Sequence, residues 1–535
     1  MGKTFNIFLA AFAATGSFLF GYDSGVMTDV IASQNFLAFF NTKSKSPVVG
    51  AINATFSGGA VLGSLMGAFT IDRFGRRRTV QIGALIASVG ALLQCAAYNL
   101  GMMLVGRIIA GWAVGLLSMS VPVYQAECAH PNIRGLIVGL TQQMIGVGFI
   151  VSSWIGYGCN HAPNRSSVQW RFPLAFQILP SLVLLVGLIW MPESPRHLLE
   201  KGQDEEALKV LRRLHANSSD ELLIQAEFTE IKSTIAKEGE VTAESWLSIF
   251  KVPEWRTRLM HGTLIQVFTQ LTGASKLRID RSAGSRALTN QDVINYYQTI
   301  MYEALGFTGQ RGVLVAGLYN IVGPVTNFFF IVFILDRVGR RKPLLFGAIG
   351  ITVTLISEAV LNAVNPDGSK RGLSIAGVFF IFLFSVIFSL SFGPISWVYM
   401  AEIMPLSIRG RGNAFAAGIG NWLVATIFAQ VSPIALARIT WKYYFVFVTF
   451  NLCVTIPTIA LIFKETKQLS LEEIDLLFGQ EGGRTVDQEI VERERVRRRS
   501  TIVVNEDVQQ QTMITLHEKA DEIKNENIRS LKYAA

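Results

Sequence analysis

Eleven apolar segments, each of about 20 residues, follow one another along most of this chain of 535 residues. A helix of about 20 apolar residues is long enough to cross a hydrocarbon core roughly 30 Å thick. The segments cover residues 7–30, 51–71, 79–98, 101–123, 136–158, 172–191, 311–335, 343–363, 373–400, 412–436 and 442–463. Charged residues make up only 16% of the chain, against roughly 25% in soluble domains. The sequence therefore predicts an all-α membrane protein, because helices satisfy their own backbone hydrogen bonds in lipid.

One further candidate span, residues 259–305, is interrupted by a charged stretch. Its two ends look like a membrane helix, but five charged residues, from Lys276 to Arg286, stand between them. Each such charge costs about 2.5–3.5 kcal/mol at the centre of an inserted helix. Without residues 275–292 the segment reads as one more helix, which gives twelve transmembrane helices in total.

Two loop motifs occur twice. "DRFGRR" at residues 72–77 returns as "DRVGRR" at 336–341, and "VYQAECAHPNIRG" at 123–135 returns as "VYMAEIMPLSIRG" at 398–410. Their recurrence in the same order is typical of parallel repeats that are related about the membrane normal. It predicts two pseudo-symmetric bundles of six helices.

The sequence predicts four regions. We expect a first bundle over residues 1–191, a polar linker with short helices over 192–258, a second bundle over 259–463, and a largely disordered polar tail over 464–535. The basic motifs fall on alternate loops, so the positive-inside rule places them, the linker, the tail and both termini in the cytoplasm.

The same rule accounts for the formal net charge of +9 without a nucleic-acid partner, since the charge lies mainly in the loops and the tail. The four cysteines show neither the spacing of a metal site nor that of a disulfide framework. No nucleotide-binding loop or nucleophile motif stands out. We therefore expect no enzyme, no cofactor and no metal site.

Several motifs together resemble those of the sugar porters, a family of the major facilitator superfamily, in its fungal monosaccharide-transporter form. They are "FGYD" (20–23), "GRIIAGWAVG" (106–115), "PVYQAE" (122–127), "PESPRHL" (192–198), "GPISW" (393–397), "KETK" (464–467) and the doubled "DRxGRR". The resemblance implies uptake of a monosaccharide, a hexose with some tolerance of pentoses, by alternating access across the plasma membrane. It also implies a carrier that acts as a monomer in the lipid bilayer.

A sugar that leaves water needs many neutral hydrogen-bonding groups, which amide side chains offer as both donors and acceptors. The resemblance places sugar-binding amides at Gln142, Gln266, Gln270, Asn320 and Asn421, and an aromatic residue against the sugar at Trp397. An amide inside the membrane can alternatively join two helices. Thr269 stands where many sugar porters have a second glutamine, which leaves the choice among sugars open.

Asp23 and Arg107 are charged residues within predicted spans, where such residues are expensive and usually functional. A movement of Arg107 would decide whether Asp23 holds or releases a proton. Among the sugar porters that the chain resembles, this aspartate is typical of proton-coupled members, so we predict proton symport. The alternatives are a static salt bridge in a facilitative uniporter, a polyol or quinate-type transporter, and a sugar receptor that does not transport.

Charged residues at the helix ends are predicted to pair with one another and to hold the two halves together while the site faces outward. The alternative is that they only fix the orientation in the membrane. These residues are Asp72, Arg76, Glu127, Arg134, Glu193, Arg196, Asp336, Arg340, Glu402 and Arg409.

In the sugar porters that the chain resembles, the seventh helix reads L-T-G-x-N-V-I-N-Y-Y. Here "LTGA" and "VINYY" are separated by residues 275–292, and the asparagine is missing. The codons of Ser275-Lys276, Leu288-Thr289 and Gln291-Asp292 permit a splice donor, a branch site and an acceptor. Splicing there keeps the reading frame and gives "QLTGANVINYYQ". We interpret the segment as a retained intron; the alternative is a genuine loop that bulges into an aqueous cavity.

Overall fold

The structure, a computed structural model, describes residues 2–42, 47–129, 133–159, 161–163, 166–214, 246–272, 310–364, 370–405, 408–428 and 442–467, with a few short pieces between and after them. Every regular element in these ranges is helical. Ten helical segments there are long and apolar enough to cross a membrane, which confirms the predicted all-α membrane fold. The chain divides into two compact units, residues 1–475 and residues 476–535, and the helices below belong to the first.

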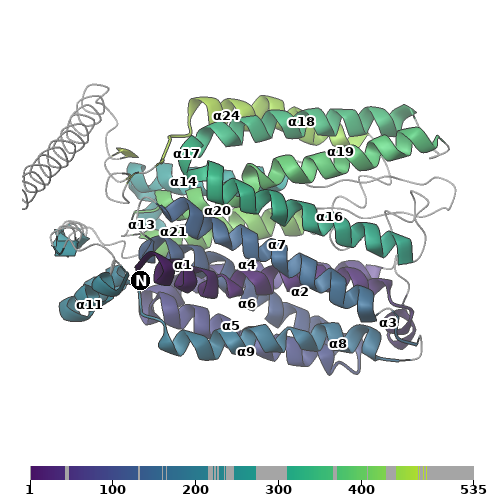
Figure 1. Cartoon of the computed structure of the whole chain (residues 1–535), viewed down its shortest axis with the longest axis horizontal. Helices are drawn as coiled ribbons and strands as arrows, with labels where there is room; N and C mark the ends of the chain where they lie inside the picture. Colours follow the sequence, from purple (N-terminus) through teal and green to yellow (C-terminus); the bar gives the residue numbers. More distant parts are fainter. Residues whose placement is uncertain are drawn as a thin grey trace, which may run out of the picture. The chain divides into compact units, whose positions relative to one another are not determined.

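The first half of the chain, up to residue 191, supplies the helices drawn in purple to blue in Figure 1. They are α1 (Gly2–Ala13), α2 (Thr15–Ala32), α3 (Gln34–Phe39), α4 (Pro47–Phe74), α5 (Arg76–Cys95), α6 (Leu100–Cys128), α7 (Arg134–Cys159), α8 (Val168–Phe176), α9 (Ile178–Gly187) and the 3₁₀ turn η2 (Leu188–Trp190). Three short helices follow: α10 (Pro195–Glu200), α11 (Asp204–Leu214) and α13 (Trp246–Lys251).

The second half supplies the helices drawn in teal, green and yellow. They are α14 (Pro253–Leu271), α16 (Gln310–Phe329), η4 (Phe330–Ile334), α17 (Leu335–Val338), α18 (Arg341–Val364), α19 (Arg371–Ser389), α20 (Phe392–Ile403), α21 (Arg409–Phe415), η6 (Ala416–Leu423), α23 (Tyr443–Phe450), η8 (Asn451–Thr455) and α24 (Ile456–Leu461). The segments η4, η6 and η8 are π-helical turns inside longer helices, a feature that is frequent at functional sites.

Two of the predicted spans are described only in part. Helix α14 ends at Leu271, and residues 273–309 lie outside the described ranges, so the interrupted segment 275–292 does too. The span predicted at 412–436 is helical up to residue 428 and is not described from there to residue 441. Both interpretations of residues 275–292 stay predictions.

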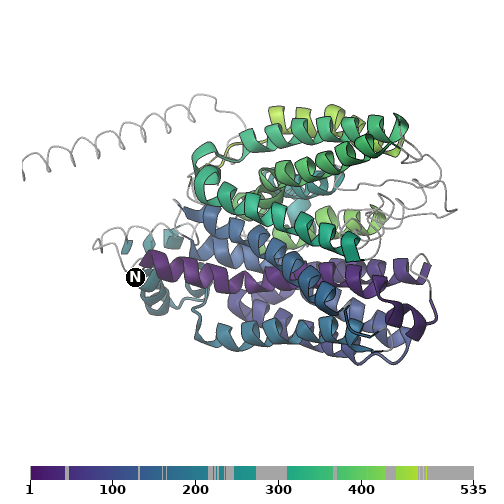
Figure 2. The same ribbon diagram turned by 45° about the vertical axis from the view of Figure 1, so that its right-hand side comes forward.

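The two halves meet along α7 and α16, which lie side by side in both views (Figures 1 and 2) and contact each other. An ideal Cβ at Gly146 of α7 would lie 2.4 Å from the ring of Pro324 of α16, so the two helices approach closely there. The halves also meet where η6 and α21 of the second half pack against α4 of the first.

Helices α4 and α6 pack backbone against backbone through two reciprocal Gly-x-x-x-Gly pairs. The close contacts are Gly59 to Ile108, Gly63 to Trp112, Gly111 to Phe56 and Gly115 to Ala60. In each contact an added Cβ would lie 2.0–2.3 Å from the facing carbonyl oxygen. Small residues permit such approach in membranes, where helices associate by packing and not by exclusion of water.

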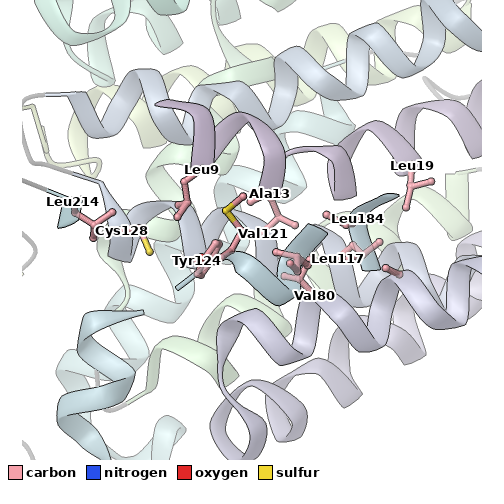
Figure 3. Close-up of a cluster of buried hydrophobic side chains, with 13 residues drawn as sticks. Leu9, Ala13, Leu19, Val80, Leu117, Val121, Tyr124, Cys128, Leu184 and Leu214 are labelled. Carbon is pink, nitrogen blue, oxygen red and sulfur yellow. The ribbon is translucent and has the colours of Figure 1, made fainter. Parts of the chain in front are cut away.

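A cluster of buried apolar side chains gathers α1, α2, α5, α6 and α9 into one bundle (Figure 3). Leu117 and Val121 of α6 lie in its middle, and Leu214 at the end of α11 reaches its edge. The linker is therefore anchored to the first half. Large apolar side chains on the outer faces, such as Phe69 and Leu179, are exposed, as expected of surfaces that face lipid.

The glycine contacts generate a test with a matched control. Gly59→Ala places a Cβ against the backbone of Ile108, whereas Gly58, its neighbour on α4, has nothing within 4 Å of its own Cβ position. We expect Gly59→Ala to destabilise the purified chain by roughly 1–3 kcal/mol through overpacking. Gly58→Ala should leave the stability unchanged or raise it slightly, since alanine is the better helix former.

Thermal unfolding of the two variants in detergent, followed by tryptophan fluorescence, measures the difference. Equal melting temperatures for both would contradict the close packing of α4 on α6.

Candidate functional site

In each "DRxGRR" motif, a glutamate from a later part of the chain caps the start of the helix that follows the motif glycine. Glu193 Oε1 accepts hydrogen bonds from the backbone N–H groups of Arg76 and Arg77, both at 3.0 Å. Gly75 precedes this helix with φ +91°, and a Cβ there would lie 2.7 Å from Glu193 Oε2. The motif therefore needs glycine for its left-handed backbone and for the room that the glutamate occupies.

The second half repeats this arrangement. Glu465 accepts from the backbone N–H groups of Arg340 at 2.8 Å and Arg341 at 3.0 Å. Gly339 has φ +95°, and a Cβ there would lie 2.6 Å from Glu465 Oε2. Glu193 belongs to "PESPR" and Glu465 to "KETK", so these two motifs have the same role in the two halves. The repeat extends further than the sequence comparison of the loops indicated.

The first arginine after each motif glycine binds a second glutamate within its own half. Arg76 donates to Glu127 at 3.0 Å, and Ser194 donates to the same carboxylate at 2.5 Å. In the second half Arg340 donates to Glu402 at 2.8 Å, and Thr466 donates to it at 2.8 Å. These four predicted residues, Arg76, Glu127, Arg340 and Glu402, are thus brought together in matching pairs.

The two aspartates of the motifs reach across to the opposite half. Asp336 Oδ2 accepts from the backbone N–H of Leu136 at 3.1 Å. Arg411 Nε lies 3.5 Å from Asp72 Oδ2. A Cβ at Gly135 would lie 2.0 Å from Asp336 Oδ1, and one at Gly410 would lie 2.4 Å from Asp72 Oδ1. The glycine of each "IRG" sequence therefore makes room for the aspartate of the other half.

Further contacts join the halves at the same end of the helices, which we call the basic end because residues 72–78 and 336–342 lie there. Arg409 lies 3.4 Å from Glu127 across the boundary. Arg134 donates to the backbone oxygen of Leu469 at 3.1 Å. Arg196 is buried in α10. The described residues thus close the basic end.

His197 and Glu200 enlarge this cluster in the first half, and the sequence analysis missed them. Arg76 Nη1 lies 2.7 Å from His197 Nδ1 and donates to Glu200 at 3.0 Å. Burial alone would raise the pKa of Glu200, but Arg76 and His197 lower it to about 2, so Glu200 stays ionised. The spacing of His197 and Glu200, three residues apart on α10, is the one signal that could have indicated them.

Asp23 and Arg107 form an ion pair inside the first bundle. Arg107 Nη1 lies 2.8 Å from Asp23 Oδ1, the arginine is fully buried, and Asp23 is 4% exposed. Arg107 Nε also donates to the backbone oxygen of Ile52 at 3.4 Å, and the guanidinium lies 4.2 Å from the ring centroid of Phe56. The pair therefore joins α2, α4 and α6.

Most of the predicted amides gather around α20 and η6. Gln270 of α14 donates to Asn421 of η6 at 2.5 Å. Gln266 donates to the backbone oxygen of Ser396 on α20 at 3.4 Å, and its own carbonyl oxygen has no hydrogen-bond partner. Gln142 of α7 approaches α20 from the other half, since a Cβ at Gly393 would lie 3.4 Å from its Cγ.

An aromatic group lies beside these amides. Phe20 of α2 packs against Trp397 of α20 at 6.5 Å and against Trp422 of η6 at 4.9 Å between ring centroids. Trp422 also donates to Ser118 of α6 at 3.1 Å. Phe20, Trp422 and Ser118 were not among the predicted site residues, although Phe20 belongs to the "FGYD" motif.

Asn320 lies at the boundary between the halves. It donates to Ser153 of α7 at 2.7 Å. About two turns further along α16, Asn327 donates to Gln143 of α7 at 2.8 Å. In this conformation Asn320 joins α7 to α16, which is the alternative that the sequence analysis left open for an intramembrane amide.

The chain is similar to known proteins in three comparisons. The sequence profile of the family "Sugar (and other) transporter" matches residues 9–278 and 283–478. The MFS-type transporter criB of Aspergillus cristatus is 38% identical over 94% of this chain and 99% of its own. The MFS glucose transporter mfs1 of Aspergillus flavus is 31% identical over 89% of this chain and 90% of its own.

Among solved structures, the proton:xylose symporter XylE bound to 6-bromo-6-deoxy-D-glucose superimposes with a TM-score of 0.78 at 23% identity, over 89% of this chain and 100% of its own. This likeness shows the fold, which is that of the major facilitators. Because the profile and the relatives cover nearly the whole chain, the protein belongs to the sugar (and other) transporter family of the major facilitator superfamily, a family of membrane transporters and not of enzymes.

Proposed function

We propose that this protein takes up a monosaccharide by alternating access and couples the uptake to a proton. The observation that carries the proposal is the fully buried Asp23–Arg107 pair in a chain of this family. A buried ion pair stabilises a fold little compared with well-packed apolar residues. Its presence in a membrane span is therefore best explained by a function that needs the charge.

The orientation follows from the positive-inside rule, which places the basic end, the linker and both termini in the cytoplasm. The ion pairs and glycine contacts between the halves at this end then close the cytoplasmic side. The conformation is that of a carrier whose site is shut toward the cytoplasm. We propose the plasma membrane as its location and a monomer as its active form.

The sugar would bind among the amides of α14, α20 and η6. Gln266 has a free carbonyl oxygen, and Gln270 and Asn421 bind each other in this structure. A sugar hydroxyl can replace that mutual bond, because each amide offers both a donor and an acceptor. Trp397 would cover one face of the ring, and Gln142 would contribute from the first half. Asn320 would join them after it leaves Ser153.

A hexose is the first substrate to test. Uniport, transport of a polyol or of a quinate-type compound, and sugar sensing without transport are the competing functions. They differ in measurable ways: a uniporter is insensitive to a protonophore, the polyol or quinate transporter is inhibited by that compound, and a receptor gives no uptake.

The coupling rests on exchange of partners by Arg107. While Arg107 holds Asp23, the carboxylate is ionised. When the halves move and Arg107 withdraws, an isolated carboxylate in a medium of low dielectric constant is too costly and takes up a proton. Release of the proton on the other side then accompanies the return of Arg107. In this scheme Asp23 carries one proton for each cycle.

Uptake of labelled glucose tests the proposal in cells that lack their own hexose carriers. We compare the 535-residue chain with a shortened chain in which one asparagine replaces residues 275–292, each with and without a protonophore. The shortened chain should take up glucose and lose this uptake with the protonophore. The full chain should transport poorly, because charged residues interrupt its seventh helix.

The other outcomes are equally informative. Equal uptake by the full chain would refute the retained intron and make residues 275–292 a genuine loop. Uptake that the protonophore leaves unchanged would favour uniport. No uptake by either chain, with normal surface expression, would favour another substrate or a receptor.

A second prediction concerns Asp23 itself. In membrane vesicles with an imposed pH gradient, Asp23→Asn should abolish accumulation of labelled glucose above its outside concentration, because asparagine cannot carry the proton. Exchange of labelled for unlabelled glucose across the membrane, which needs no net proton movement, should persist. Accumulation equal to that of the unsubstituted chain would remove Asp23 from the coupling.

A further inference from the structure

Helix α2 contains a second buried carboxylate that the proposed cycle does not use. Asp29 is 4% exposed and lies six residues after Asp23, which places it about 9 Å further along the helix axis. It lies toward the end where α2 meets α3, opposite the basic end (Figure 1). A carboxylate at this depth needs an explanation of its own.

The carboxylate of Asp29 is inserted between α2 and α7. A Cβ at Gly156 of α7 would lie 2.1 Å from Asp29 Oδ2, so only glycine leaves room for the acid at this contact. One turn earlier, Gly25 of α2 faces Ser152 of α7, whose hydroxyl would lie 2.2 Å from an added Cβ. The two helices therefore pack closely at the carboxylate and one turn before it.

No cation is bound to this carboxylate in the described part of the chain. Asp29 Oδ2 has no hydrogen-bond partner. On α2 and toward this end of α6, α7 and α8, the titratable or charged residues include Tyr22, Asp23, Arg107, Tyr157, Cys159 and Arg171.

Each of these side chains is engaged elsewhere or is itself neutral. Tyr22 donates to the backbone oxygen of Pro173 at 2.9 Å, and Arg107 is bound to Asp23. Arg171 donates to the backbone oxygen of Ala97 at 3.3 Å. An ionised carboxylate that is buried without a partner costs so much free energy that it takes up a proton instead. The unpartnered oxygen therefore favours the protonated form of Asp29, whereas Arg107 favours the ionised form of Asp23.

We propose that Asp29 is a second proton-carrying residue of the transport cycle and that it supplies the proton that Asp23 accepts when Arg107 withdraws. The inference rests on the proposed proton symport. In this step the O–H bond of Asp29 breaks, the proton passes through bridging water, and a new O–H bond forms on Asp23. As this proton leaves, a hydronium ion at the α3 end gives a proton to Asp29 and becomes water, so neither carboxylate stays ionised without a partner.

Infrared spectroscopy of the purified full chain tests the first half of the proposal without any sugar. The carbonyl stretch of a protonated carboxylic acid should be present at neutral pH and should be reduced in Asp29→Asn. It should be retained in Asp23→Asn. The control is Ser24→Ala, which removes another buried and unpartnered polar atom from α2 and should leave the band unchanged. Identical spectra for the unsubstituted chain and Asp29→Asn would overturn the proposal.

Proton transport tests the second half. In vesicles loaded with a pH indicator, glucose addition to the transporting form should carry protons inward, and Asp29→Asn should lose this flux and its dependence on outside pH. Glucose exchange should continue in the variant, which shows that the protein is folded. If Asp29→Asn fails to reach the membrane, Asp29→Ser replaces it, with the same expected losses.

The results separate this inference from the proposed function. If the unsubstituted chain exchanges glucose but moves no protons, the symport fails and the relay fails with it. If the chain moves protons and Asp29→Asn moves them equally at every pH, only the assignment of Asp29 fails.

Discussion

A charge that is buried between membrane helices must have a partner, and this requirement organises the described part of the protein. Arg76, Arg107, Arg340 and Arg409 are each at most 3% exposed. Each is bound to a carboxylate. Of these contacts only that of Arg409 with Glu127 crosses the boundary between the halves. Because breaking a buried pair leaves an uncompensated charge, Arg409 must find another acceptor when the halves move. The transport cycle is thus limited to conformations that supply every buried arginine with an acceptor.

The sequence was sufficient to predict the helices and the repeat, because apolar spans and basic loops are local patterns. It was also sufficient to name Asp72 and Asp336 and to predict that charged residues at the helix ends pair with one another, as Asp72 does with Arg411 and Asp336 with Arg340. Asp336, however, also binds the backbone of Leu136. A backbone N–H has no signature in the sequence, which is why this contact could not be predicted.

For the site residues, too, the sequence indicated the residues but not the partners that they bind. The motif comparison named Gln270 and Asn421 separately, and only the fold shows that they bind each other. Asn320 was named with them, yet it binds Ser153 at the boundary between the halves. His197 was missed because its role depends on the contact of α10 with Arg76, which the sequence does not show. The resemblance thus identified residue types and positions, whereas their pairing depends on helix packing that no single motif encodes.

The boundary between α7 and α16 has a mechanical consequence. Asn320 to Ser153 and Asn327 to Gln143 are polar contacts at two levels of the same pair of helices. These two contacts oppose the separation of α7 from α16. They still permit one helix to tilt or slide on the other when the two halves move. Substitutions along this pair of helices would therefore change how fast the carrier turns over, while the proposed sugar-binding residues around α20 would determine what it carries.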